Sequence, residues 1–182
     1  KDSDADISLI QSRKVGIVGF GNQGQAQALN LMDSGVNVCI GIREGGTSRK
    51  SAELDELNCC SISETLRSCD IISLLIPDQV MGEVYQAELE PYFKKGQTLL
   101  FAHGYNIHYD VIHPPEFINV VMAAPSGAGS ELRKQYKAGK GIPGLFAIFQ
   151  DYTGDSREVV LAYCKAIGLT RIGVFESTFK EE

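Results

Sequence analysis

Short apolar segments alternate with amphipathic ones along the chain, and this alternation predicts strands and helices in turn. The segment VGIVGF (15–20) is typical of a buried strand. The next residues place Ala26, Leu29 and Met32 at helical spacing, which predicts a helix over 22–34 that ends at Gly35. The segment VNVCIGI (36–42) then predicts a second strand.

The same alternation continues to the end of the chain. Helices are predicted over 48–57, over 63–69 with Ser63 at its start, over 77–89 and over 155–167. Strands are predicted over 58–62, 70–76, 98–103, 118–124, 144–150 and 171–175. Strands that alternate with helices predict an α/β fold, here a Rossmann-like, doubly wound, mostly parallel sheet with helices on both faces. Neither an internal repeat nor a low-complexity linker interrupts the pattern, so we expect a single domain over 1–182.

Composition narrows the function classes. The net charge of the 182 residues is −6, and the basic residues are scattered, which argues against a nucleic-acid surface. The longest apolar runs fall short of the roughly 18 residues of a membrane span, and we expect a cytoplasmic protein. The five cysteines form neither a C-x-x-C pair nor a zinc-ligand pattern, so we expect reduced thiols, with Cys59 and Cys60 in a strand. Because the chain starts at Lys1 and ends at Glu182 without a cap, we expect both ends to be cut.

Three glycines follow the first predicted strand in the pattern G-x-G-x-x-G. Gly19, Gly21 and Gly24 stand between that strand and an amphipathic helix, which is the context that a dinucleotide site requires. Gly19 would make the sharp turn, Gly21 would let the backbone approach a pyrophosphate, and Gly24 would let helix and strand pack closely. The free amides at the start of the helix would bind the pyrophosphate. The alternative is a purely structural turn.

The end of the second strand indicates which dinucleotide binds. A site for NAD usually has an acidic residue there, which binds the ribose 2′-hydroxyl. Here Arg43 takes that place, and Thr47, Ser48 and further cations and hydroxyls follow. Such groups suit a 2′-phosphate, so NADP is the expected cofactor. The alternative, a solvated basic loop, stays open because Glu44 is among these residues.

Several segments together resemble the ketol-acid reductoisomerases of branched-chain amino-acid synthesis, in their short, bacterial-type form. They are LIQSRKVGIVGFGNQGQAQALNLMDSGVNV, IGIREG, LLIPDQ, FAHGYNIHY, APSGAG and ESTFKEE. The resemblance implies an NADP-binding domain of about this size and a knotted helical C-terminal domain, which is absent from this chain. It also implies magnesium-dependent alkyl migration in 2-acetolactate or 2-aceto-2-hydroxybutyrate, followed by reduction by NADPH.

The resemblance assigns roles to individual residues. Residues at the pyrophosphate would be Phe20, Gly21, Asn22 and Gln23; those at the 2′-phosphate would be Arg43 and Ser48, with Thr47 as a substitute for the family's serine at 46. Asp78, Gln79, Val80 and Met81 would line the adenosine or ribose side, and Gly129 would touch the cofactor. His103 would be the catalytic residue beside the nicotinamide.

His103 also has support from the pattern alone. It closes a buried strand at its carboxyl end, where open α/β sheets bind ligands, and an imidazole there could relay a proton. A histidine at a strand end is also often a hydrogen-bonded structural group. His108 and His113 follow in what the sequence predicts as an exposed polar loop.

Further positions besides Gly46 depart from the family pattern. Ser126 stands where short-form members usually have lysine, and Gln25 and Gln27 stand where histidines are usual. The lysine lies near the substrate and the metal ions in the family, so its loss could alter activity. Two other readings therefore stay open: another NADP-dependent dehydrogenase, or a module that binds NADPH without doing chemistry.

Magnesium ligands are expected outside this chain. The family's first magnesium carboxylates would lie just beyond Glu182, and Glu181 and Glu182 themselves are expected to be solvated. We therefore predict no metal ligands within the chain, acetohydroxy acids as substrates, and a homo-oligomer for the full-length protein.

Overall fold

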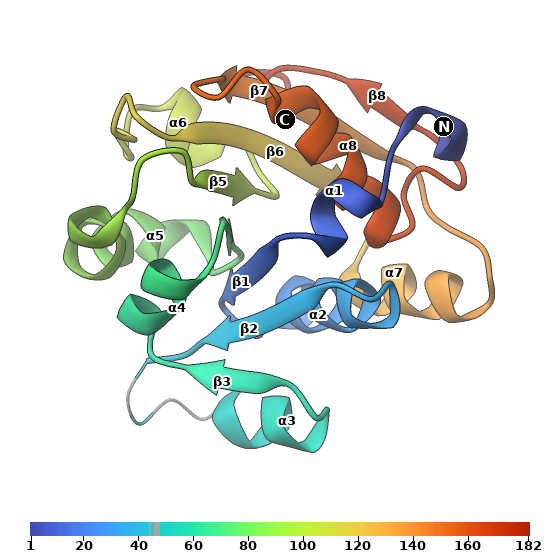
Figure 1. Cartoon of the computed structure of the whole chain (residues 1–182), viewed down its shortest axis with the longest axis horizontal. Helices are drawn as coiled ribbons and strands as arrows, with labels where there is room; N and C mark the ends of the chain where they lie inside the picture. Colours follow the sequence, from blue (N-terminus) through green and yellow to red (C-terminus); the bar gives the residue numbers. More distant parts are fainter. Residues whose placement is uncertain (44, 46–47) are drawn as a thin grey trace.

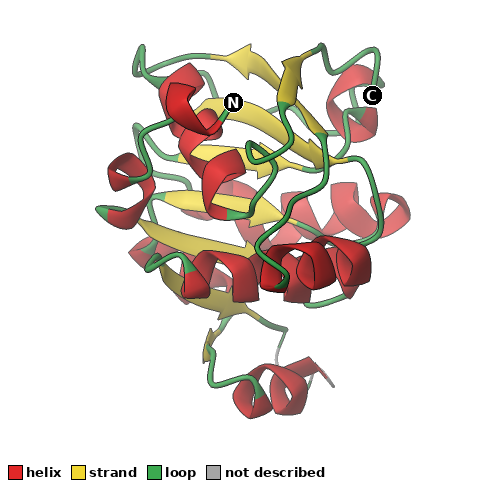
Figure 2. Cartoon of the chain, turned by 90° about the vertical axis from the view of Figure 1, so that its right-hand side faces the viewer, coloured by secondary structure: helices red, strands yellow, loops and turns green. Residues whose placement is uncertain are grey.

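One eight-stranded sheet runs through the protein, with helices on both of its faces (Figure 1, Figure 2). The computed structural model describes residues 1–43, 45 and 48–182. The strands are β1 (Lys14–Val18), β2 (Asn37–Gly41), β3 (Asn58–Cys60), β4 (Ile71–Leu74), β5 (Thr98–Phe101), β6 (Asn119–Pro125), β7 (Gly144–Gln150) and β8 (Val174–Glu176). Their order in the sheet is β3-β2-β1-β4-β5-β6-β7-β8.

Parallel pairing dominates the sheet, which confirms the predicted fold. Only β6 and β7 pair antiparallel among the described strands. From β1 the chain continues to β2 and β3 on one side and then returns to β4, which pairs with the other side of β1. Open α/β sheets bind ligands at the carboxyl ends of strands on the two sides of such a switch.

The helices are α1 (Ser8–Gln11), α2 (Asn22–Asp33), α3 (Ser48–Leu54), α4 (Ile62–Ser68), α5 (Asp78–Val84), α6 (Tyr105–His108), α7 (Gly129–Lys137) and α8 (Ser156–Ala166). A π-helical turn (Tyr85–Leu89) and a 3-10 turn (Glu90–Tyr92) extend α5, and a 3-10 turn (Asp2–Asp4) precedes α1. In the described part of the chain, none of these helices combines the length and apolar character of a membrane span.

Both faces of the sheet are buried, as the continuous apolar run of β4 predicts. Ile71 packs into the cluster that contains α2 and α8, whereas its neighbour Ile72 packs into the cluster that contains α4 and α5. Both side chains are fully buried. The five cysteines are free thiols, and Cys59 and Cys60 lie in β3 as predicted.

The prediction that Ser63 starts a helix was wrong by two residues. Ser61 is the N-cap of α4: its hydroxyl accepts a hydrogen bond from the Glu64 backbone N–H at 3.2 Å. The Glu64 carboxylate in turn accepts from the Ser61 backbone N–H at 3.0 Å. This reciprocal pair requires Glu or Gln three residues after the cap, which Ser61 has and Ser63 lacks.

Helix α7 was absent from the predicted elements. Its sequence GSELRKQYK buries only Gly129 and Leu132, so its apolar pattern is weak. Arg133 attaches it to α2, with donated hydrogen bonds to Asp33 Oδ2 at 2.6 Å and Asn30 Oδ1 at 2.9 Å. Contacts between segments about 100 residues apart thus stabilise a helix that its own sequence marks poorly.

Candidate functional site

Two adjoining cavities form a cleft at the carboxyl ends of β1, β2, β4 and β5. The adenosine-side cavity, of about 250 Å³, lies beside the end of β2, and the central cavity, of about 500 Å³, extends to the end of β5. Both are lined by Gly19, Phe20, Ser48, Ile76 and Pro77, so they are parts of one cleft. The cleft lies at the switch between β1 and its two neighbours.

The glycine turn after β1 is shaped by contacts that exclude side chains. Gly19 has a φ of +105°, and a Cβ there would lie 2.6 Å from the Leu75 carbonyl oxygen. A Cβ at Gly24 would lie 2.1 Å from the Gly19 carbonyl oxygen. At Gly21 a Cβ would have nothing described within 4 Å, because it would enter the open central cavity. Packing thus requires glycine at position 24, whereas the lack of a side chain at Gly21 leaves the central cavity open beside the start of α2.

Helix α2 directs its free amino end into the central cavity. Gly21 is its N-cap, and the Gln25 N–H makes the first hydrogen bond of the helix, to the Gly21 carbonyl. The amides of Asn22, Gln23 and Gly24 lie ahead of that bond. Free amides at a helix start suit an anion, and the sequence predicts a pyrophosphate there.

A chain of hydrogen bonds that leads into the protein interior fixes the side chain of Gln23. Gln23 Nε2 donates to the Gly127 carbonyl at 2.9 Å, and its Oε1 accepts from Gln27 Nε2 at 3.1 Å. Gln27 Oε1 accepts from the Tyr163 hydroxyl at 2.7 Å, and Ser73 Oγ donates to that hydroxyl at 3.0 Å. Burial raises the pKa of Tyr163 well above its ordinary value, so the phenol stays protonated and donates. The sequence did not indicate this chain, which joins α2 to α8 and β4.

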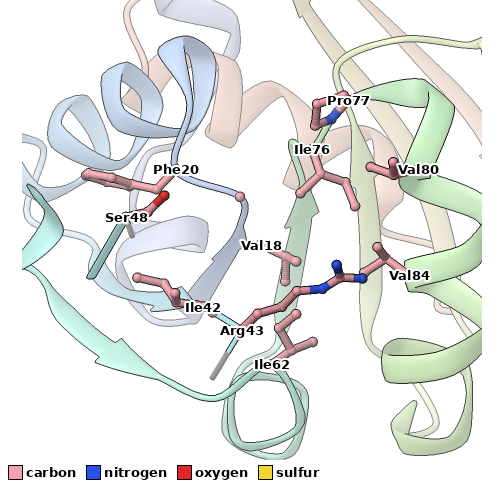
Figure 3. Close-up of a pocket in the computed structure, with 12 residues that line it drawn as sticks. Val18, Phe20, Ile42, Arg43, Ser48, Ile62, Ile76, Pro77, Val80 and Val84 are labelled. Atoms are coloured by element: carbon pink, nitrogen blue, oxygen red, sulfur yellow. The ribbon is translucent and has the colours of Figure 1, made fainter. Parts of the chain in front are cut away.

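The adenosine-side cavity has mostly aliphatic walls (Figure 3). Val18, Ile42, Ile62, Ile76, Val80 and Val84 line it, together with Arg43 and Ser48. Arg43 Nε donates to Glu88 Oε1 at 2.7 Å, an ion pair that the sequence did not reveal. Ser48 begins α3 and lines both cavities. Thr47, predicted at the 2′-phosphate, lies outside the described residues.

The four residues predicted from α5 divide among different surroundings. Asp78 and Met81 line the central cavity, and Val80 lines the adenosine-side cavity. Gln79 is exposed on the helix and belongs to the lining of neither cavity as described.

Gly129 lies at the start of α7, packed against the start of α2. A Cβ there would lie 2.1 Å from the Asn22 carbonyl oxygen, and the Ser130 N–H donates to Asn22 Oδ1 at 2.7 Å. Among the described residues, Gly129 is outside the lining of the two cavities. Its direct effect in this structure is to fix Asn22.

His103 lies two residues beyond the end of β5, at the junction between the central cavity and a third one. This outer cavity, of about 240 Å³, shares His103 and Asp78 with the central cavity and is otherwise lined by α6 and the C-terminal segment. His103 is exposed. Behind it, a Cβ at Gly104 would lie 2.0 Å from the Phe179 carbonyl oxygen. The C-terminal segment therefore packs directly on the turn that carries His103.

Asn106 is a further residue of this junction that the sequence did not single out. It is buried on α6, and its Nδ2 donates to Asp78 Oδ1 at 3.1 Å. His108, predicted in a loop, ends the short helix α6 and is exposed, as is His113. Ser126 is also exposed, and its N–H donates to the Pro143 carbonyl at 2.9 Å. Within the described residues, no three or more His, Cys, Asp or Glu side chains converge as a metal site would require.

Comparisons with known proteins show the family of the chain. Residues 9–173 match the family described as acetohydroxy acid isomeroreductase, NADPH-binding domain. The chain is 46% identical over 181 residues to a ketol-acid reductoisomerase (NADP(+)) of Pyrococcus abyssi, and 48% identical to that of Methanothermobacter thermautotrophicus. All of the chain aligns, but it covers only 54% and 55% of these relatives, so it spans about half their length.

A solved structure is also similar over the entire chain. It is that of an NADH-preferring ketol-acid reductoisomerase from an uncultured archean, with a TM-score of 0.96 and 40% identity. The chain covers 56% of it.

Proposed function

The chain belongs to the acetohydroxy acid isomeroreductase family, whose NADPH-binding domain it matches, and on this premise we propose that it is the cofactor-binding part of a ketol-acid reductoisomerase. Such an enzyme converts 2-acetolactate or 2-aceto-2-hydroxybutyrate to dihydroxy acids, in the synthesis of valine and isoleucine. Because the chain spans about half the length of its relatives, the activity and the substrates of the whole protein are part of this proposal.

The shape of the cleft supports NADPH as its ligand. The open cradle at Gly21 and the free amides of α2 suit a pyrophosphate, and a Cβ at Gly21 would enter that space. The aliphatic walls beside β2 suit an adenine ring, and Arg43 and Ser48 lie at the same end of the cleft. Phe20, Asn22 and Gln23 line the space between the two ends.

The observation that carries the proposal is the position of His103 and Asp78, which line both the central and the outer cavity. A dinucleotide anchored at the glycine turn extends from the adenosine side toward this junction. When bound, NADPH supplies a hydride. His103 would donate a proton to the oxygen of the substrate ketone in the outer cavity, since hydride transfer to a ketone leaves an alkoxide that needs a proton. Asn106 would orient Asp78 beside it through the Nδ2 hydrogen bond.

We place no step of the reaction on a metal ion, because the described residues do not offer a metal site. The magnesium ligands that the resemblance implies would lie in a part of the protein beyond these residues. Homo-oligomerisation, a cytoplasmic location and the single domain over 1–182 likewise remain predictions.

Titration with NADPH tests the first part of the proposal, and turnover tests the second. We expect the 182-residue chain to bind NADPH but not to consume it with 2-acetolactate and magnesium, since a missing metal removes several kcal/mol of transition-state stabilisation. The loss of NADPH absorbance measures turnover. A protein extended to the length of the relatives should be active under the same conditions. Clear turnover by the 182 residues alone would show that the metal site has been misplaced.

A further inference from the structure

We propose that Glu88 sets the cofactor preference of the cleft by holding Arg43 across the adenosine-side cavity, away from the position of the 2′-phosphate. This inference rests on the proposed function, because it requires NADPH and NADH to bind in the cleft. Glu88 would be a positioning residue that acts through Arg43.

The ion pair joins the two sides of the adenosine-side cavity. Arg43 follows β2 on one side, and Glu88 lies in the π-helical turn that extends α5 on the other. Their contact, from Nε to Oε1 at 2.7 Å, is short enough to fix the direction of the long arginine side chain. In Figure 3 the guanidinium reaches toward Val84 and away from Ser48.

The position of Glu88 on its helix explains this reach. Val84 lines the cavity, and Glu88 follows one turn later on the same side of the helix. The Glu88 carboxylate therefore lies on the side of the cavity opposite to β2. An arginine that pairs with it must cross the cavity and become part of its wall, as the lining shows.

This arrangement affects the two cofactors differently. A 2′-phosphate requires the charge of Arg43 near the start of α3, where Ser48 lies, whereas NADH has no such phosphate. Glu88 competes with the phosphate for the guanidinium, so it weakens NADPH binding and leaves NADH binding nearly unchanged. The pair is partly exposed, with side-chain exposures of 54% for Arg43 and 34% for Glu88. Pairs with this degree of exposure change an equilibrium constant by up to about fivefold.

The test compares the dissociation constants of NADPH and NADH for the purified full-length protein. In Glu88→Gln we expect NADPH affinity to rise by up to about fivefold, and the ratio of NADPH to NADH affinity to rise with it. Glu83→Gln is the matched control, since it removes the same charge from an exposed position of α5. The control should leave the ratio of the two constants unchanged.

A second pair of variants tests whether Glu88 acts through Arg43. In an Arg43→Gln background, Glu88→Gln should no longer change the ratio. An equal rise with and without Arg43 would mean that the carboxylate repels the phosphate directly, and the inference would be wrong. An unchanged or lower ratio in Glu88→Gln alone would also overturn it. If the unaltered protein bound neither cofactor, the proposed function itself would fail, and this inference with it.

Discussion

The glycine turn after β1 and the Arg43 side chain after β2 line the same cleft but are held in different ways. The turn is fixed by backbone contacts: at positions 19, 24 and 129, a Cβ would lie less than 3 Å from a neighbouring carbonyl oxygen. A chain of four hydrogen bonds, of which the two at Tyr163 are buried, also connects the Gly127 carbonyl through Gln23 to Ser73. Arg43 is more than half exposed, and among the described residues its side chain pairs with the carboxylate of Glu88.

Because of this difference, the binding of a dinucleotide and the choice between NADPH and NADH depend on different parts of the cleft. A pyrophosphate cradle built from backbone can change only if the fold around it changes. A preference built from exposed side chains can change by one substitution at little cost to stability. The following predictions test this separation, starting with the largest effect.

Gly24→Ala should damage the folded protein itself. The added Cβ would lie 2.1 Å from the Gly19 carbonyl oxygen, and overpacking of this kind costs about 3 kcal/mol. We expect the melting temperature to fall by about 6–12 °C, measured by circular dichroism. Gly21→Ala is the control, because its Cβ meets open space and its φ of −85° suits alanine. Equal melting temperatures for the two variants would contradict the packing argument.

Arg43→Asp should reverse the cofactor preference without affecting the fold. Replacing a cation with a carboxylate removes charge-assisted bonds of about 1.5–3 kcal/mol and repels the 2′-phosphate, so NADPH affinity should fall about hundredfold. The new carboxylate can accept a hydrogen bond from the ribose of NADH. Calorimetric titration of both cofactors measures the change, with NADH as the internal control. A parallel loss of both affinities would argue that Arg43 has a structural role.

Gly21→Ala should lower the affinity for both NADPH and NADH by about tenfold. Its melting temperature should stay within about 2 °C of that of the unaltered protein. The added methyl group would narrow the cradle for the pyrophosphate, which NADPH and NADH share, so their ratio should not change. Fluorescence titration with each cofactor checks this. A loss of affinity for NADPH alone would mean that position 21 affects the 2′-phosphate and not the pyrophosphate.

Tyr163→Phe should have the smallest effect on binding. It removes the donor to Gln27 Oε1 and the acceptor of Ser73 Oγ, and unsatisfied buried groups of this kind cost about 1–3 kcal/mol. We expect a melting temperature lower by about 2–12 °C and NADPH affinity within about threefold. Ser73→Ala, which removes only the last member of the chain, should destabilise less. A binding loss beyond tenfold would show that Gln23 depends on the chain more closely than we infer.

The order of strands and helices could be read from the sequence because each buried segment carries its own apolar pattern. The run DIISLLI predicts a strand covered on both faces, and β4 is one. The glycine turn was equally readable, since strand, glycines and helix are contiguous. Helix α7 was not, because only Leu132 marks its buried side beyond Gly129.

The parts of the site that the sequence did not indicate all join distant segments. Arg43 and Glu88 are 45 residues apart, and Gln27 and Tyr163 are 136 apart. Neither pair has a local pattern that distinguishes it from ordinary surface charges or polar helix positions. The same holds for Asn106, which belongs to the segment FAHGYNIHY but whose contact with Asp78 depends on how α5 and α6 pack.

The close packing of Gly104 on Phe179 also has a consequence for the order of events during protein synthesis. The residues described as lining the adenosine-side cavity have all left the ribosome once α5 has emerged, whereas the turn that carries His103 lacks its packing partner until residue 179 has emerged. At about 5–20 residues per second, the roughly 95 residues between these two points take about 5–19 s. We therefore expect a nascent chain to be able to hold a nucleotide before the His103 turn reaches its final conformation.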